Sequence, residues 1–109
     1  MPGWPIARAD ALLAINMVHI SPWSSTAGLF AGAARILPPE APIILYGPYL
    51  EAEVPTTQSN RDFDAWLKAR DPQWGLRQRS AVEELAATQH FRLAERHSLP
   101  ANNLLLVFR

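Results

Sequence analysis

The chain has 109 residues with ten basic and ten acidic side chains, and 49% of its residues are hydrophobic. This composition fits one folded domain, and the balanced charge gives no electrostatic basis for binding nucleic acid or an anionic membrane. The lack of cysteine excludes disulfides, thiolate catalysis and cysteine-type zinc sites. No apolar stretch approaches the ~20 residues of a membrane span, and the start does not resemble a secretory signal, so we expect a cytoplasmic protein.

The first predicted element is a strand over residues 11–18. Its first five residues are apolar without alternation, which is typical of a strand that is buried on both faces inside a parallel sheet. Asn16, His19 and residues 21–23 (Ser-Pro-Trp) lie at its end and beyond it. Because α/β sheets bind ligands beyond the carboxyl ends of their strands, this cluster is the candidate site. A central strand also needs a neighbour on each side, and the sequence offers none upstream.

A helix follows, with its N-cap expected among residues 24–26 (Ser-Ser-Thr). It is expected to run to about Leu37, where two prolines end it. Residues 42–46 are again apolar throughout and predict a second buried strand. Gly47 ends that strand, and a polar loop follows.

Two capping patterns predict two further helices. Ser59 with Asp62 indicates one helix, and Ser80 with Glu83 indicates the next. Residues 91–96 alternate in polarity like an edge strand, and residues 103–108 form a final buried strand. The two strands are too close in sequence for a helical crossover, so we expect them to pair antiparallel in the order β-α-β-α-α-β-β.

Six short segments, in order along nearly the whole chain, resemble the C-terminal half of one family, DUF938 (methyltransferase-like 26). The resemblance implies a partial α/β sheet of the class I methyltransferase (Rossmann-like) type, whose full strand order is 3-2-1-4-5-7-6. The strands predicted here correspond to 4-5-7-6, with strand 7 antiparallel. The matching segments are residues 16–23 (NMVHISPW), 28–35 (GLFAGAAR), 45–48 (LYGP), 59–60 with 63–64 (SN, FD), 70–75 (RDPQWG) and 100–104 (PANNL).

In such enzymes S-adenosylmethionine is held mainly by the first half, through a glycine-rich turn after strand 1 and an acid after strand 2. This chain has no such turn, because Gly28 and Gly32 lie inside a predicted helix and follow no Gly-x-Gly pattern. We therefore expect residues 1–109 to form the C-terminal half of a methyltransferase-like domain, with the cofactor-binding half absent. Cofactor binding by this chain alone is then not expected.

Two residues at the end of the first strand are the first candidates for the site. The resemblance places Asn16 at the cofactor, and the alternative is a strand-end cap for backbone groups. His19 is the candidate catalytic base, since an unperturbed histidine pKa of ~6.5 suits proton transfer. The alternative for His19 is a buried structural histidine.

Four further residues are candidates for binding the methyl acceptor. Trp23 either stacks on a ligand or covers the core, and Tyr49 follows the second strand into the pocket. Ser59 and Asn60 begin a helix that would form a lid over that pocket. No metal site is expected, since the three histidines lack metal-ligand spacing and no paired carboxylates suggest one.

The resemblance implies methyl transfer from S-adenosylmethionine to an unknown acceptor. One rival is a truncated, non-catalytic remnant, or an interaction module that pairs its exposed first strand with another chain. That rival predicts homodimers or aggregates and no cofactor affinity. A second rival is an acceptor-binding module that works with a separate cofactor-binding subunit.

Overall fold

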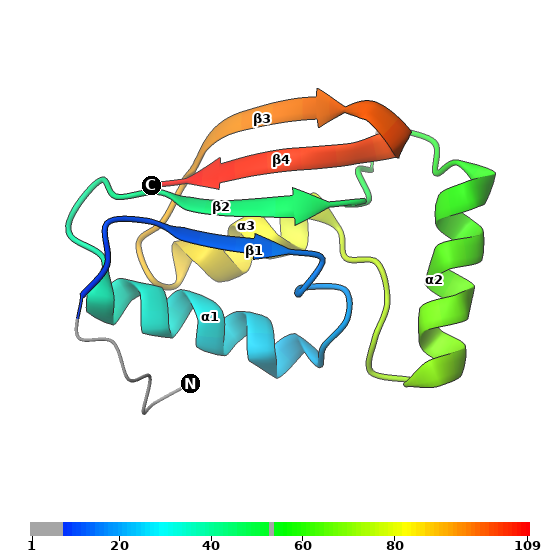
Figure 1. Cartoon of the computed structure of the whole chain (residues 1–109), viewed down its shortest axis with the longest axis horizontal. Helices are drawn as coiled ribbons and strands as arrows, with labels where there is room; N and C mark the ends of the chain where they lie inside the picture. Colours follow the sequence, from blue (N-terminus) through cyan, green and yellow to red (C-terminus); the bar gives the residue numbers. More distant parts are fainter. Residues whose placement is uncertain (1–7, 53) are drawn as a thin grey trace.

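The computed structural model describes residues 8–52 and 54–109 as four strands, three α-helices and one short 3-10 helix (Figure 1). The predicted order of strands and helices is confirmed. The elements are β1 (Leu12–Ile15), α1 (Trp23–Ile36), β2 (Ile43–Gly47), α2 (Gln58–Arg70), α3 (Arg79–Ala87), β3 (Leu93–Leu99), η1 (Pro100–Asn102) and β4 (Asn103–Phe108).

The four strands form one mixed sheet in the order β1-β2-β4-β3. β1 and β2 are parallel, with Leu12 opposite Ile43 and Ile15 opposite Tyr46. β4 lies between β2 and β3 and is antiparallel to both. The predicted partial sheet, with its antiparallel last strand, is therefore confirmed. The carboxyl ends of β1 and β2 meet at one edge of this sheet, as parallel strands must.

One face of the sheet is covered by α1 and α3, which run beneath the strands in Figure 1. The core lies between these two layers and is apolar. Phe30 of α1 meets Phe108 of β4 edge-on, with 5.5 Å between ring centroids. Ile43 and Leu45 of β2 complete the centre with no exposed surface. Burial of this kind supplies most of the stability of a small domain.

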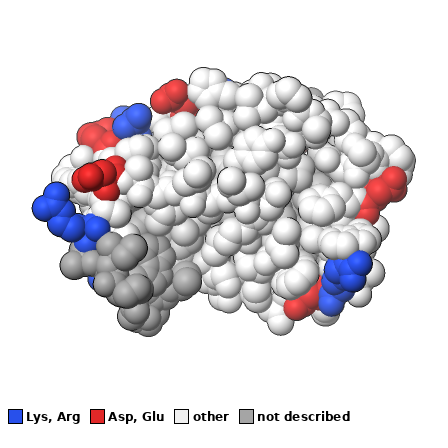
Figure 2. All heavy atoms as spheres, in the orientation of Figure 1, with Lys and Arg blue, Asp and Glu red and all other residues white. Residues whose placement is uncertain are grey.

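The prediction that the first strand is buried on both faces is wrong. Leu13 is 61% exposed and Ile15 is 60% exposed, while Leu12 and Ala14 pack against the core. The strand is also shorter than predicted, since the chain turns at Asn16. β1 is an edge strand, and no helix in residues 8–52 or 54–109 covers its outer face. Figure 2 shows one broad face of the molecule, in the orientation of Figure 1. Most of this face is uncharged, and the charged groups lie near the two ends of the molecule.

The predicted helix caps are wrong at all three helices. α1 begins at Trp23, so residues 24–26 lie inside it, and Pro22 at the N-cap makes no side-chain cap. α2 is capped by Thr57, whose hydroxyl accepts a hydrogen bond from the backbone N–H of Asn60. α3 follows Gln78, again without a side-chain cap. A capping pattern of a few residues can occur by chance. Where a helix begins also depends on where the preceding strand or loop ends.

α2 lies at the end of the sheet and contributes only Leu67 as a buried residue (Figure 1). Trp66 on the same helix is 50% exposed. Its ring stacks near Phe63, and the Arg70 guanidinium carbon lies 3.8 Å from its centroid. Within the described residues, no helix has the length and apolar character needed to cross a membrane.

Candidate functional site

The candidate site begins where β1 ends, at a tight turn around Asn16. The Asn16 backbone N–H donates to the carbonyl of Tyr46, 2.8 Å away, and so continues the pairing with β2. Asn16 then takes a left-handed conformation with φ of 57°, which asparagine tolerates better than most residues. Its carbonyl accepts hydrogen bonds from the backbone N–H groups of His19 and Ile20. This turn folds His19 back towards the end of β2.

Gly47, the last residue of β2, lies directly against the side chains of Asn16 and His19. A Cβ placed on Gly47 would lie 3.0 Å from Asn16 Oδ1 and 3.0 Å from His19 Nε2. Only glycine leaves both side chains this close to the strand end. Both of these polar atoms are buried and have no hydrogen-bond partner among the described residues. Buried polar atoms in this condition are uncommon and mark a place where a bound group or a water belongs.

His19 is completely buried, and its ring is fixed by backbone groups from a distant loop. Its Nδ1 accepts a hydrogen bond from the backbone N–H of Arg77 at 3.2 Å. The neutral tautomer that this bond favours carries its hydrogen on Nε2. Burial lowers the pKa of His19 to about 4, with a further lowering from the positive charge of Arg77. At neutral pH the imidazole is therefore uncharged and presents Nε2–H.

Arg77 ties the loop after β1 to the loop before α3. Its guanidinium donates to the carbonyls of Val18, Ser21 and Gln73. It also lies 5.4 Å from the ring centroid of Trp23, within cation–π range. These bonds hold both loops around His19.

Tyr49 connects His19 to a cavity beyond the end of β2. Its ring is 4.5 Å from the His19 ring, centroid to centroid, and tilted by 59°. It is buried, and burial raises the pKa of its hydroxyl above the ordinary value. The cavity has a volume of about 170 Å³, and both Tyr49 and Asn60 line it. Asn16 and Tyr49 are thus brought together around His19, with Asn60 close by.

Ser59 and Trp23 lie apart from this group. Ser59 is exposed on α2 and has its hydroxyl 3.2 Å from that of Thr57. It does not line the cavity. Trp23 packs against the core at the start of α1, beside Arg77. The roles predicted for all six site residues remain predictions.

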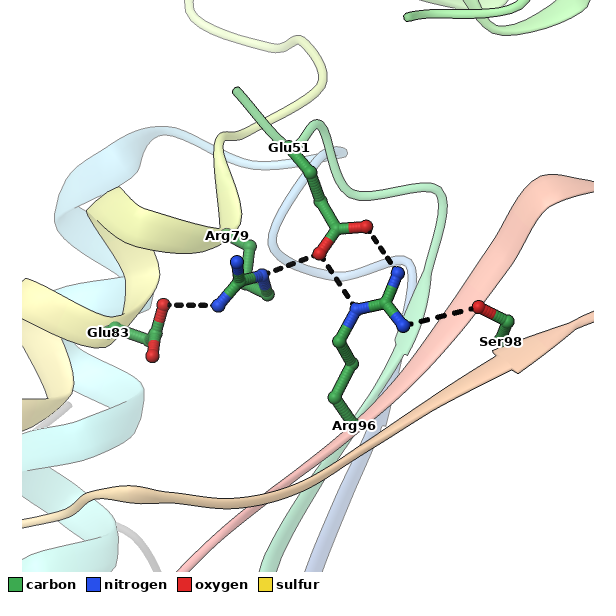
Figure 3. Close-up of polar contacts among 5 residues, drawn as sticks. All are labelled: Glu51, Arg79, Glu83, Arg96 and Ser98. Carbon is green, nitrogen blue, oxygen red and sulfur yellow. Dashed lines mark hydrogen bonds and ion pairs between the residues drawn. The ribbon is translucent and has the colours of Figure 1, made fainter. Parts of the chain in front are cut away.

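A buried carboxylate, Glu51, also lines the cavity. Figure 3 shows its contacts with two arginines. Arg96 of β3 grips it with two hydrogen bonds, and Arg79 of α3 donates a third at 2.6 Å. Arg79 also pairs with Glu83 one helical turn on, at 2.7 Å. Hydrogen bonds from Arg96, and then from Arg79, lower the pKa of Glu51 despite its burial. The carboxylate therefore remains ionised and compensated at neutral pH.

Sequence reasoning did not identify the contacts of Glu51 with Arg96 and Arg79. Glu51 and Arg96 are 45 residues apart, so no local spacing connects them. The only signal in the sequence was a single acidic residue, Glu51, shortly after an apolar strand. The sequence did indicate that Gly47 ends a buried strand. It did not indicate the contact with His19, because that contact depends on the turn at Asn16.

Among the described residues, Asn16 has an unpartnered atom whose chemistry suits part of S-adenosylmethionine. The orphaned Oδ1 of Asn16 can accept a hydrogen bond from an ammonium or hydroxyl group of the cofactor. No glycine-rich turn follows a strand in residues 8–52 or 54–109, so the groups that would enclose the rest of the cofactor are not among them. The same residues contain no cluster of three or more potential metal ligands.

Three solved structures have closely similar folds despite low sequence identity. The mitomycin 7-O-methyltransferase MmcR has a TM-score of 0.83 at 16% identity, over 95% of this chain and 30% of that chain. CalO1, a methyltransferase in calicheamicin biosynthesis solved with SAH bound, has a TM-score of 0.78 at 13% identity, over 94% and 30%. A pericyclic reaction enzyme has a TM-score of 0.80 at 17% identity, over 96% and 27%. The chain spans about a third of the length of each.

The fold of this chain is thus that of the C-terminal portion of class I methyltransferases. Its sequence also matches a family described as a protein of unknown function (DUF938), over residues 4–109. That match covers almost the whole chain, and it agrees with the resemblance carried by the six sequence segments. The chain therefore belongs to the DUF938 family.

Proposed function

We propose that this chain forms the acceptor-binding half of an S-adenosylmethionine-dependent methyltransferase. The observation that carries the proposal is the convergence of Asn16 Oδ1 and His19 Nε2 on Gly47. These two unpartnered polar atoms lie at the carboxyl ends of parallel strands, where open α/β sheets bind their ligands. The similarity in fold to an SAH-bound methyltransferase supports the choice of cofactor.

The chain's own residues would orient the reacting groups. When bound, the cofactor supplies a methyl group on a positively charged sulfur. This chain would have to align an acceptor atom with that methyl group, and the proton of the acceptor would pass to a base or to water. Asn16 Oδ1 would accept a hydrogen bond from a bound donor, and His19 would donate through Nε2–H. Correct alignment is the main contribution a protein makes to such a displacement.

The structure sets a condition on His19 as the base. In the tautomer that Arg77 favours, Nε2 carries the hydrogen and only Nδ1 has a lone pair that could accept a proton. The backbone N–H of Arg77 already donates a hydrogen bond to that lone pair. His19 can take a proton on Nε2 only if this bond breaks and the hydrogen moves to Nδ1. His19 could therefore act as a base only if the loop that carries Arg77 rearranged. It could act as a hydrogen-bond donor without any rearrangement.

The proposal is tested by calorimetric titration with S-adenosylhomocysteine. The chain is measured alone and joined in frame to the preceding half of a DUF938 relative. We expect binding only by the joined protein, and a severalfold weaker affinity in its Asn16→Gly variant, because glycine keeps the left-handed turn and removes Oδ1. Gln89→Ala, far from the site, serves as control. A folded joined protein that does not bind S-adenosylhomocysteine would refute the proposal.

A variant pair separates the two roles of His19. His19→Asn keeps an oxygen near the position of Nδ1, and His19→Gln keeps a donor near the position of Nε2. If His19 orients a ligand as a donor, the glutamine variant retains more affinity than the asparagine variant. If it is a base, cofactor affinity is unchanged in both, and any methyl transfer is lost in both.

A second candidate function is favoured by the exposure of β1. Leu13 and Ile15 present apolar side chains on a strand whose outer edge is unpaired among the described residues. Such an edge readily pairs with another chain. We propose as the alternative that the chain is a non-catalytic interaction module or remnant that associates through β1. Light scattering over a range of concentrations tests it, since a strictly monomeric chain with no partner would exclude this function.

A further inference from the structure

The cavity beyond Tyr49 has the size of one small ring. It lies between the loop after β2, the start of α2 and the turn that joins β3 to β4, and it measures about 170 Å³. For comparison, an apolar cavity of roughly 150 Å³ is enough to hold benzene. A single six-membered ring with small substituents therefore fits.

The lining of the cavity is half apolar and half polar. Leu50, Leu99 and Leu104 supply apolar surface, while Thr56, Asn60 and Asn102 supply a hydroxyl and two amides. A planar ring with polar substituents has the matching surfaces, since its faces are apolar and its edge forms hydrogen bonds.

Both amides retain their full hydrogen-bonding capacity. Within the described part of the chain, the side chains of Asn60 and Asn102 have no hydrogen-bond partner. Each offers one acceptor oxygen and two donor hydrogens. Asn102 and its neighbour Ala101 also hold consecutive left-handed conformations, with φ of 60° and 62°. Both residues lie in the tight turn that joins β3 to β4, where positive φ is common.

The charges at the cavity are already compensated. Glu51 is held by Arg96 and Arg79, and Arg79 also pairs with Glu83. A ligand that carried a full charge would have to compete with these ion pairs. A neutral ligand satisfies the cavity without disturbing them.

We propose that this cavity is the acceptor subsite and takes a neutral, polar, single-ring compound, such as a hydroxylated benzene or an oxo-substituted nitrogen heterocycle. Asn60 and Asn102 hold the polar edge of the ring, and the leucines cover its faces. The inference rests on the proposed function, because Tyr49 joins the cavity to His19 at the strand ends. It gives that function a substrate class.

The experiment uses the 15N-labelled full chain and four probes: catechol, uracil, toluene and inositol. Each probe is titrated to millimolar concentration without cofactor, and amide resonances are followed by NMR. We expect catechol or uracil to shift the resonances of Thr56, Asn60 and Asn102 in a saturable manner. Toluene and inositol should bind at least about tenfold more weakly, since each lacks one of the two matching surfaces.

Two variants test the amides. Asn60→Ala removes one amide inside a helix, and Asn102→Gly removes the other while tolerating φ of 60°. Each should weaken binding about threefold to tenfold, as loss of one neutral hydrogen bond does, and Gln89→Ala should leave it unchanged. The two variants lie in different elements, so failure of one to fold leaves the other as the test.

Three results would overturn the inference: no shift at the cavity residues with either polar ring, binding of toluene as tight as that of catechol and uracil, or preference for inositol. None of them depends on S-adenosylhomocysteine. Failure of the cavity to bind a ring is thus distinguishable from failure of the joined protein to bind the cofactor product.

Discussion

Replacing Gly47 by alanine tests the close contact on which the candidate site is built. The new Cβ would lie 3.0 Å from Asn16 Oδ1, 3.0 Å from His19 Nε2 and 3.1 Å from His19 Cδ2. These separations are several tenths of an ångström shorter than ordinary contacts. The site cannot relax on one side, because His19 is buried and held by Arg77 and Gly75. Either Asn16 or the end of β2 must move.

The expected cost follows from two opposing effects. Overpacking of a well-filled interior costs about 1–3 kcal/mol. The smaller entropy of the unfolded alanine chain offsets about 0.4–1 kcal/mol. We therefore expect Gly47→Ala to lower the free energy of unfolding by about 1–2 kcal/mol. For a domain of this size that corresponds to a fall in melting temperature of about 5–10 °C.

Urea denaturation followed by circular dichroism measures this change, as a shift of the midpoint at constant slope. The double variant Asn16→Gly/Gly47→Ala supplies the control, because it removes one of the two crowded side chains. We expect it to recover about 0.5–1 kcal/mol relative to the sum of the single variants. A Gly47→Ala protein as stable as the wild type, or additive single variants, would show that the strand ends are not packed in this way.

Three further predictions concern charge and exposure. Glu51→Gln should destabilise the fold by about 1–3 kcal/mol in urea denaturation, less than for a fully buried ion pair because Arg79 and Arg96 are partly exposed; an unchanged midpoint would contradict this. His19 stays neutral in the fold until its pKa of about 4, whereas the unfolded chain takes up this proton near pH 6.5. The free energy of unfolding should thus fall as pH drops from about 6.5 towards 4, by ~3 kcal/mol at most, and His19→Gln should remove this dependence between pH 5 and 7; an equal slope in both proteins would refute it. Leu13→Lys and Ile15→Lys should change stability by no more than ~0.5 kcal/mol, since both residues are exposed. If the chain self-associates through β1, these substitutions should abolish that association in light scattering.

Much of the fold could be predicted because it depends on short-range patterns. Apolar runs located β1, β2 and β4, and the short connection between β3 and β4 required an antiparallel pair. The exposure of Leu13 and Ile15 could not be predicted in this way. An apolar residue in a strand has the same local pattern whether or not another element covers it, and burial depends on what packs against each face.

The sequence by itself determined the element order, the sheet type and the position of Asn16 and His19 at a strand end. Only the tertiary structure decided that His19 is fully buried, that Arg77 fixes its tautomer, and that Glu51, Arg79 and Arg96 meet beside a ring-sized cavity. The physical reason is the range of the interactions. Periodicity and turn chemistry act over a few residues, whereas these contacts join residues 28 to 58 positions apart. They exist only once the sheet has brought those segments together.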